Sequence, residues 1–234
     1  MKNMIAIIPA RGGSKGLPGK NLRSLEGLPL IAWTIKSAQE CQLVDSIVVT
    51  SDDSEILSIA SEFGVSQLIR RPDELATDDS TTGDAVRHVL SVIEQPENFV
   101  LLQPTSPLRN SAILTESIRL FQNSKSKSLV SVTRSTESPY WTFKLTNGLL
   151  QRVIEDSLFF DQRQKLPKTY VLNGAIYIWN TSHFLSHGDL ISNSTLGFEM
   201  SSEVSIDIDS LEDFEEATRI FRRVNNIKTE KEFR

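Results

Sequence analysis

Near its start the chain reads Ile5-Ala-Ile-Ile-Pro-Ala-Arg-Gly-Gly-Ser-Lys-Gly-Leu-Pro-Gly-Lys-Asn21. The apolar run from Ile5 to Ile8 predicts a short buried strand, and a loop with four glycines follows it. Glycine lets a backbone approach a ligand closely with its N–H groups pointing inward, which creates an anion-binding nest. Arg11, Lys15 and Lys20 add three cations, as a polyphosphate ligand requires. The stretch therefore predicts a strand followed by a loop that binds a nucleoside triphosphate.

The spacing of this loop excludes two other phosphate-binding motifs. A P-loop needs Ser or Thr after Gly-Lys, and here Asn21 follows. The Gly-x-Gly-x-x-Gly motif of dinucleotide-binding proteins is also absent. The alternative interpretation is a glycine-rich surface turn with solvated lysines. The position directly after a first strand favours a ligand site, because ligands of open α/β sheets bind at the carboxyl ends of strands.

Strand-like and helical segments alternate through the first half of the chain. Helical periodicity covers residues 30–39, 54–63, 82–93 and 111–123, and strand patterns cover residues 46–50, 65–69, 98–102 and 128–132. Helices of about ten residues between strands imply βαβ units and a mostly parallel sheet. The sequence thus predicts one α/β domain over residues 1–234, with a three-layer, Rossmann-like architecture.

The second half of the chain changes character. Residues 140–164 lack the alternation, and their aromatic side chains predict an inserted segment that makes a dimer contact. Strand patterns return at residues 174–179 and 205–209. An amphipathic helix is expected from residue 211 to 221, capped by Asp209 or Ser210, and the charged tail 228–234 is expected to fray.

Composition limits the classes of partner and location. The chain is 39% apolar and 24% charged with a net charge of −5, as in ordinary globular proteins. This balance predicts no general binding to nucleic acid or to anionic membranes. No apolar stretch approaches the ~20 residues that span a bilayer, and Pro9 and Arg11 end the first apolar run, so we expect a cytoplasmic protein. Cys41 is the only cysteine, which excludes an internal disulfide and a cysteine-based zinc site.

Four separated motifs occur together in one order. They are Ile8-Pro-Ala-Arg-Gly-Gly-Ser-Lys-Gly, Arg71-Pro-Asp-Glu-Leu-Ala, Leu101-Leu-Gln-Pro-Thr-Ser-Pro-Leu-Arg109, and Asn173-Gly-Ala-Ile-Tyr177 followed by Ser205-Ile-Asp-Ile-Asp209. Together they closely resemble the acylneuraminate cytidylyltransferases, also called CMP-sialic acid synthetases, from about residue 4 to residue 222. The related Kdo cytidylyltransferases share a glycine-rich opening but lack the Lys20-Asn21 and Asn173-Gly-Ala-Ile-Tyr pairing. They are the alternative within the same fold.

The resemblance implies a nucleotidyltransferase fold, a reaction and a set of site residues. In this family a nine-carbon 2-keto sugar acid attacks the α-phosphate of CTP and expels pyrophosphate, giving a CMP-sugar. Arg11, Lys15 and Lys20 would hold the triphosphate and act in catalysis together with Asp207 and Asp209. The implied nucleotide-binding residues are Ala10, Arg11, Gly12, Gly13, Ser14, Lys15, Lys20, Asn21, Arg71, Ser80, Thr81 and Thr82. The implied sugar-binding residues are Gln103, Arg163, Asn173, Gly174 and Tyr177.

Asp207 and Asp209 also predict a metal site. If residues 205–209 form a strand, side chains two apart share one face, and two carboxylates with substrate phosphates suit Mg²⁺ (or Mn²⁺). The alternative is that Asp209 only caps the following helix. A non-catalytic, nucleotide-binding regulator remains a second class of function, although such a protein needs no metal site beside the α-phosphate.

Two positions depart from the branch that acts on N-acetylneuraminic acid. Trp141 stands where that branch has a lysine, and Val171 stands where it has an arginine. Both lie in the half expected to meet the sugar. The prediction for the nucleotide is unaffected, and the sugar is left open between N-acetylneuraminic acid and a bacterial relative such as legionaminic acid.

Overall fold

The computed structural model describes residues 4–14, 16–77, 79–154, 162, 165–188 and 191–232, with side chains described up to residue 224. Within these residues the chain builds a seven-stranded sheet in the order β11-β7-β10-β6-β1-β4-β5. Its strands are β1 (Met4–Pro9), β4 (Ser46–Ser51), β5 (Gln67–Arg70), β6 (Asn98–Leu101), β7 (Ser128–Arg134), β10 (Tyr170–Asn180) and β11 (Leu196–Glu199).

The sheet is mostly parallel, as predicted. β1 pairs in parallel with β4 and with β6, β4 with β5, and β7 with β11. β10 is antiparallel to both of its neighbours, β6 and β7. The carboxyl ends of β1, β4, β5 and β6 therefore meet at one edge of the sheet, and the amino-terminal half of the antiparallel β10 comes to that same edge.

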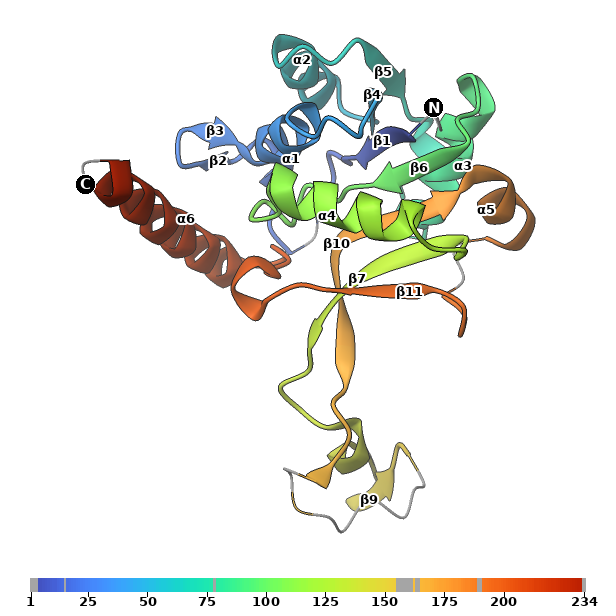
Figure 1. Cartoon of the computed structure of the whole chain (residues 1–234), viewed down its shortest axis with the longest axis vertical. Helices are drawn as coiled ribbons and strands as arrows, with labels where there is room; N and C mark the ends of the chain where they lie inside the picture. Colours follow the sequence, from blue (N-terminus) through green and yellow to red (C-terminus); the bar gives the residue numbers. More distant parts are fainter. Residues whose placement is uncertain are drawn as a thin grey trace.

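Helices cover both faces of the sheet and make three layers (Figure 1). Successive β1 residues point to opposite faces. Ala6 and Ile8 pack in the core with α1 (Leu30–Gln39), α2 (Ser54–Glu62) and α4 (Ser111–Gln122). Ile5 and Ile7 pack on the other face with α3 (Thr82–Val92) and α5 (Thr181–His187). A strand apolar on both sides is the pattern of a buried parallel strand, and this explains the unbroken run from Ile5 to Ile8.

Polar side chains fix where three of these helices begin. Asp53 accepts a hydrogen bond from the N–H of Glu55 at the start of α2, and Asn110 accepts one from Ile113 at the start of α4. Thr81 and Asp84 form a reciprocal capping box at the start of α3. These caps satisfy amide groups that a helix leaves unpaired in its first turn, and they place the first turn of α3 beside the edge described above.

The last helix is longer than predicted, and it begins at one of the two predicted caps. α6 runs from Leu211 to Glu232, so residues 228–232 of the tail that was expected to fray continue the helix (Figure 1). Its cap is Ser210, whose hydroxyl accepts the N–H of Asp213 while Asp213 Oδ2 accepts the N–H of Ser210. Asp209 therefore does not cap the helix through its side chain.

The predicted strand over residues 205–209 is wrong. These residues form no strand and belong to no sheet, and Ile208 donates one backbone hydrogen bond to the carbonyl of Thr105 at 2.8 Å. The alternating pattern arises because Ile208 is buried against Leu17, Leu25 and α6. A loop segment with one buried side can therefore show a period of two without any strand neighbour.

An arm leaves the sheet where β7 and β10 extend beyond it (Figure 1). Its described part holds a short 3-10 helix (Pro139–Trp141) and a hairpin of β8 (Phe143–Thr146) and β9 (Leu149–Arg152). This segment begins near the predicted insert 140–164, of which residues 155–161, 163 and 164 lie outside the described residues. A second small hairpin, β2 (Ser24–Leu25) and β3 (Leu28–Pro29), packs against α6.

Candidate active site

The loop after β1 lies at the edge where the parallel strands end. The N–H of Gly12 donates to Asp52 Oδ1 at 3.0 Å, so a residue that follows β4 anchors the loop. A Cβ atom on Gly12 would lie 2.8 Å from Asp53 Oδ2, and one on Gly16 would collide with the carbonyl of Asp209. Glycine fits at both positions because the Asp53 side chain approaches Gly12, and the backbone of Asp209 approaches Gly16, too closely for another side chain.

The buried side chain of Asn21 holds the loop together. Its Nδ2 donates to the carbonyl of Arg11 at 2.9 Å, and its Oδ1 is buried without a hydrogen-bond partner among the described residues. A buried acceptor without a partner costs free energy, which a donor on a ligand would recover. The side chain of Arg11 reaches across to the carbonyl of Thr77 at 3.4 Å.

Arg71 is a buried cation at the end of β5. Its Nη2 donates to the carbonyl of Thr50 at 3.2 Å, and its Nε has no partner among the described residues. Burial lowers the pKa of Arg71, the negative charge of Asp52 opposes this shift, and the positive charge of Arg11 adds to it. Two guanidinium groups close enough to disfavour each other create a site that attracts an anion.

Lys20 and two carboxylates form the opposite wall. Lys20 Nζ donates to Asp209 Oδ1 and to the carbonyl of Ile208, both at 2.8 Å. The side chain of Lys20 is 13% exposed and that of Asp209 is 76% exposed. Asp207 opens onto the same space, but the surrounding walls partly desolvate it, and this raises its pKa. A hydrogen bond from Thr105 opposes the shift, and the charge of Asp209 adds to it.

These groups line one cleft of about 530 Å³. Its walls hold three cations, two carboxylates and a row of hydroxyl and amide groups from separate strand ends. The described lining residues are Pro9, Arg11, Ser14, Gly16, Lys20, Asn21, Arg71, Leu75, Thr77, Ser80, Thr81, Thr82, Gln103, Pro104, Thr105, Asp207 and Asp209. The size and polarity suit a nucleotide with its phosphates.

A smaller, mostly apolar pocket of about 290 Å³ adjoins the cleft and shares Thr82 and Gln103 with it. Tyr177 lines it, and its ring stacks on Trp179 with 5.6 Å between centroids and 2° between planes. Burial raises the pKa of Tyr177, and the charge of Asp207 adds to the shift. The other lining residues are Gly83, Val86, Leu101, Leu172, Trp179, Phe184 and Ile191. Most side chains that line the pocket are apolar, and Thr82, Gln103 and Tyr177 add polar groups to it.

Gly174 lies beside residues that line the cleft and the smaller pocket. Its φ is +73°, in the left-handed region, and a Cβ atom there would lie 2.8 Å from Gln103 Oε1 and 3.0 Å from Asp207 Oδ2. It sits where the register between β10 and β7 shifts, between Leu172 and Tyr177. Asn173 is buried beside it, and its amide group is engaged by protein partners, among them Ser131 at 2.6 Å and Ser205 at 2.9 Å.

The structure brings most of the predicted site residues together. Arg11, Ser14, Lys20, Asn21, Arg71, Ser80, Thr81, Thr82, Gln103, Asp207 and Asp209 line the cleft, and Tyr177 lines the adjoining pocket. Lys15 and Arg163 lie outside the described residues. The roles of all these residues toward a ligand stay predictions.

Some predicted residues lie behind the walls. Ala10 is buried in the core, Gly12 is turned toward Asp52, and Gly13 does not line the cleft. Asn173 binds neighbouring protein groups in this structure, so it supports the site from within. The sequence analysis missed Gly16 and Thr105 as lining residues and Asp52 as the anchor of the loop. Asp52 could have been predicted from the sequence, because it directly follows the second parallel strand and therefore lies at the same edge of the sheet as the loop.

An open α/β sheet with a cation-lined cleft at its strand ends defines a nucleotide-binding α/β protein. The sequence profile described as Cytidylyltransferase matches residues 5–225, and the chain belongs to this family. The resemblance drawn from the four motifs is thereby confirmed.

Relatives with curated names agree with this assignment. The chain is 37% identical over 226 residues to an N-acylneuraminate cytidylyltransferase of Escherichia coli O18:K1:H7, covering 96% of this chain and 54% of that protein. It is 35% identical over 214 residues to a CMP-N,N'-diacetyllegionaminic acid synthase of Legionella pneumophila, covering 88% and 91%. A pseudaminic acid cytidylyltransferase of Campylobacter jejuni is 30% identical over 97% of this chain and 98% of its own. The chain spans about half the length of the N-acylneuraminate cytidylyltransferases that it matches.

Solved structures show the same fold. A CMP:2-keto-3-deoxy-manno-octonic acid synthetase complexed with CTP superposes with a TM-score of 0.73 at 15% identity, over 94% of this chain and 99% of that one. A 4-diphosphocytidyl-2C-methyl-D-erythritol synthase superposes with a TM-score of 0.69 at 12% identity, over 94% and 100%. The Rossmann-like nucleotidyltransferase prediction is confirmed by these neighbours.

Proposed function

We propose that this chain is a cytidylyltransferase that joins CMP from CTP to a nine-carbon 2-keto sugar acid and releases pyrophosphate. One observation carries the proposal: the cleft combines Arg11, Lys20 and Arg71 with Asp207 and Asp209, directly beside an apolar pocket of a size for part of a sugar. The named relatives act on N-acylneuraminate, diacetyllegionaminate and pseudaminate. All three names describe acidic nonulosonic sugars, so the substrate class follows the family.

The positive charges in the cleft suit the reaction at the nucleotide. The anomeric hydroxyl oxygen of the sugar acid forms a bond to the α-phosphorus of CTP, and the bond from that phosphorus to the bridging oxygen of pyrophosphate breaks. Negative charge grows on the leaving group, and Arg11 and Lys20 are placed to stabilise it. Asn21 Oδ1 and Arg71 Nε are buried and have no hydrogen-bond partner in the part of the chain that the structure describes, so they suit the hydrogen-bonding edge of cytosine or the ribose.

A divalent cation is part of the proposal. Among the described residues, no group of three or more His, Cys, Asp or Glu side chains could hold a metal ion by itself. Asp207 and Asp209 provide two hard oxygen ligands on the cleft wall, which fits Mg²⁺, a cation that proteins bind with one or two carboxylates plus substrate phosphates. When bound, the ion would neutralise phosphate charge. Lys20 holds Asp209 in place, so its ammonium group orients one of the two carboxylates.

The apolar pocket supports a sugar with acyl or deoxy substituents. Leu172, Tyr177, Trp179 and Phe184 offer carbon surface, whereas a chain of free hydroxyls would lose its hydrogen bonds to water there. Gln103 stands between pocket and cleft and can hydrogen-bond the sugar from either side of its amide. N-acylated nonulosonic acids therefore fit better than the smaller eight-carbon Kdo.

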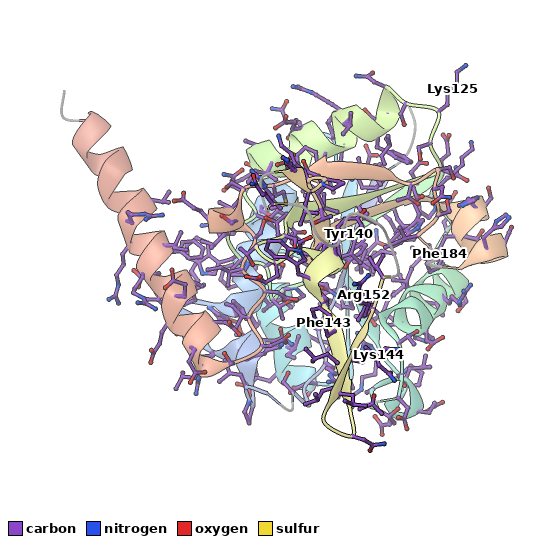
Figure 2. All side chains as sticks on the ribbon, turned by 90° about the horizontal axis from the view of Figure 1, so that it is seen from below. Lys125, Tyr140, Phe143, Lys144, Arg152 and Phe184 are labelled. Carbon is purple, nitrogen blue, oxygen red and sulfur yellow. The ribbon has the colours of Figure 1, made fainter. Side chains whose placement is uncertain are left out.

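A homodimer is also proposed, through the arm. Leu145, Leu149 and Leu150 on the hairpin are 71%, 71% and 67% exposed. Figure 2 looks along this arm and shows the side chains of Tyr140, Phe143, Lys144 and Arg152 on it. Apolar side chains gathered on a projecting hairpin mark an interaction surface. Light scattering should give twice the chain mass, and the double variant Leu145→Glu, Leu149→Glu should give the single mass. A monomeric wild-type protein at micromolar concentration would contradict this.

The test of function is pyrophosphate release. Purified protein with CTP and Mg²⁺ is offered N-acetylneuraminic acid, N,N'-diacetyllegionaminic acid, pseudaminic acid and Kdo in turn. We expect release with at least one nonulosonic acid and little with Kdo. Turnover with Kdo alone would assign the other branch of the fold. Binding of CTP without release from any acid would make the protein a nucleotide-binding regulator.

Among the described helices, none is both long and apolar enough to cross a bilayer. We propose a cytoplasmic enzyme, since CTP is a cytoplasmic substrate. Neither nucleic acid nor membrane is part of the proposed function.

A further inference from the structure

Arg109 is the largest of the fully buried side chains, with 1% of its surface exposed. It ends the loop that leads from β6 into α4. Arginine is rarely buried without a partner of opposite charge, and a buried charge without one is costly. Burial lowers the pKa of Arg109 to about 9, and no acidic side chain of the described residues opposes this shift. Its Nε and Nη2 have no hydrogen-bond partner among the described residues.

The two hydrogen bonds from the Arg109 side chain to described residues reach the proposed sugar side of the cleft. Its Nη1 donates to the carbonyl of Ala175 at 2.7 Å and lies 3.4 Å from the carbonyl of Gln103. The loop from Gln103 to Arg109 is folded by two successive backbone turns. In the first, the N–H of Ser106 donates to the carbonyl of Gln103, and in the second, the N–H of Arg109 donates to the carbonyl of Ser106. One guanidinium nitrogen therefore joins the loop after β6 to the irregular part of β10.

Both joined segments carry site residues. Ala175 follows Gly174, whose missing side chain leaves room for Gln103 Oε1 and Asp207 Oδ2. The same loop also holds the segment with the two carboxylates, because the carbonyl of Thr105 accepts the N–H of Ile208 at 2.8 Å. Shifting the loop relative to β10 would change where Gln103 and Asp207 stand in relation to each other.

We propose that Arg109 is a positioning residue that sets the sugar half of the site by fixing Gln103 against the Gly174–Ala175 backbone. This inference rests on the proposed function and names a specific determinant of sugar-acid binding. Arg109 is not among the described residues that line the cleft, and its side-chain hydrogen bonds to described residues go to Gln103 and Ala175 and not to the nucleotide-side residues Arg11, Asn21 and Arg71. Its loss should therefore affect the sugar acid and spare the nucleotide. Buried groups that break the usual rules of folding are expected at functional sites.

The test uses two substitutions in the full chain and a matched control. Arg109→Met fills a similar length without hydrogen bonds. Arg109→Lys keeps the charge and can reach one carbonyl. Arg222→Met is the control, because Arg222 is an exposed arginine whose contact is Glu26 on the β2–β3 hairpin. Readouts are kcat, the KM for the sugar acid, CTP affinity by calorimetry, and Tm.

We expect Arg109→Met to raise the sugar-acid KM tenfold or more while CTP affinity stays within threefold of the wild type. Arg109→Lys should raise that KM threefold or more but less than Arg109→Met, and Arg222→Met should leave it unchanged. A merely structural role would lower Tm and weaken both ligands alike. Equal losses of CTP and sugar-acid binding, or a folded Arg109→Met with wild-type KM and kcat, would overturn the proposal. If Arg109→Met does not fold, the KM of the folded Arg109→Lys variant decides by the same threefold criterion.

Failure of the proposed function can be told apart from failure of this inference. If the wild-type protein releases no pyrophosphate with any sugar acid, the function is wrong, and hydrogen exchange then tests the positioning role. Arg109→Met should speed amide exchange in residues 103–109 and 173–176 and leave residues 10–14 unchanged. Unchanged exchange in both of the first two segments would overturn the role of Arg109.

Discussion

Gly174→Ala tests how closely the backbone of β10 controls the cleft. The φ of +73° makes any side chain unfavourable there, at a cost of about 1–2 kcal/mol. For a chain of this size that cost lowers Tm by roughly 2–8 °C. The new methyl group would also press on Gln103 Oε1 at 2.8 Å and on Asp207 Oδ2 at 3.0 Å. Both are ends of side chains that can rotate away, so this pressure adds little to the folding cost.

The functional cost should be larger than the folding cost, because the displaced atoms line the cleft. A misplacement of reacting groups by about 1 Å can slow an enzyme roughly a hundredfold. We therefore expect Gly174→Ala to remain folded at 25 °C and to lose about tenfold to a hundredfold in kcat/KM for the sugar acid. The assay combines thermal unfolding with pyrophosphate release.

Gly27→Ala is the matched control for this prediction. Gly27 has a φ of +85° in the turn between β2 and β3, and a Cβ atom there would meet nothing within 4 Å. Both variants should lose similar Tm, and only Gly174→Ala should lose turnover. The reasoning is refuted if Gly174→Ala keeps the wild-type kcat/KM, or if Gly27→Ala loses as much.

Two further predictions follow from single side chains. Lys20→Met should raise the Kd for CTP about tenfold or more, because a charge-assisted hydrogen bond is worth roughly 1.5–3 kcal/mol; calorimetry giving an unchanged Kd would contradict a role in phosphate binding. Hydrogen bonds from Thr81 lower the pKa of Asp84, so the stability that its charge contributes is present above the ordinary carboxyl pKa of 3.8 and is lost as the pH falls through the lowered value. Asp84→Asn should therefore reduce the unfolding free energy by about 0.5–1 kcal/mol at pH 7 and by less at pH 3; denaturant titrations showing the same loss at both pH values would argue against this.

The edge of the sheet that carries the site was predictable from chain order. Arg11, Asp52, Arg71 and Gln103 each follow a strand of the parallel part, and parallel strands end on the same side. Short apolar runs separated by helical periodicity are enough to place them, because the connecting helices force successive strands to point one way. The sequence therefore predicts the convergence of residues about 90 positions apart, without any knowledge of distances.

The direction of β10 and the state of residues 205–209 were not predictable in this way. Apolar patterning shows which residues of β10 are buried, but pattern alone does not say whether a strand runs parallel or antiparallel to its neighbours. Alternation in Ser205-Ile-Asp-Ile-Asp209 reports that Ile208 is buried, which holds equally for a loop segment outside any sheet. The burial of Arg109 was hidden for a related reason. Its partners are backbone carbonyls, and these leave no signature in side-chain types.

The two halves of the site depend on different parts of the fold, and this has a consequence for specificity. The proposed nucleotide half is built by the ends of β1, β4 and β5, and the contact between Gly12 and Asp52 joins the loops after β1 and β4. The proposed sugar half is built by β10 and the loop after β6. Relatives named for three different nonulosonic acids would share CTP and differ in sugar, so we expect their differences to gather in the second half. Val171 lies on β10 and Trp141 in the arm that extends from β7 and β10, and both side chains are exposed. Exchanging them for lysine and arginine should therefore change the preferred sugar acid and leave CTP affinity as it is.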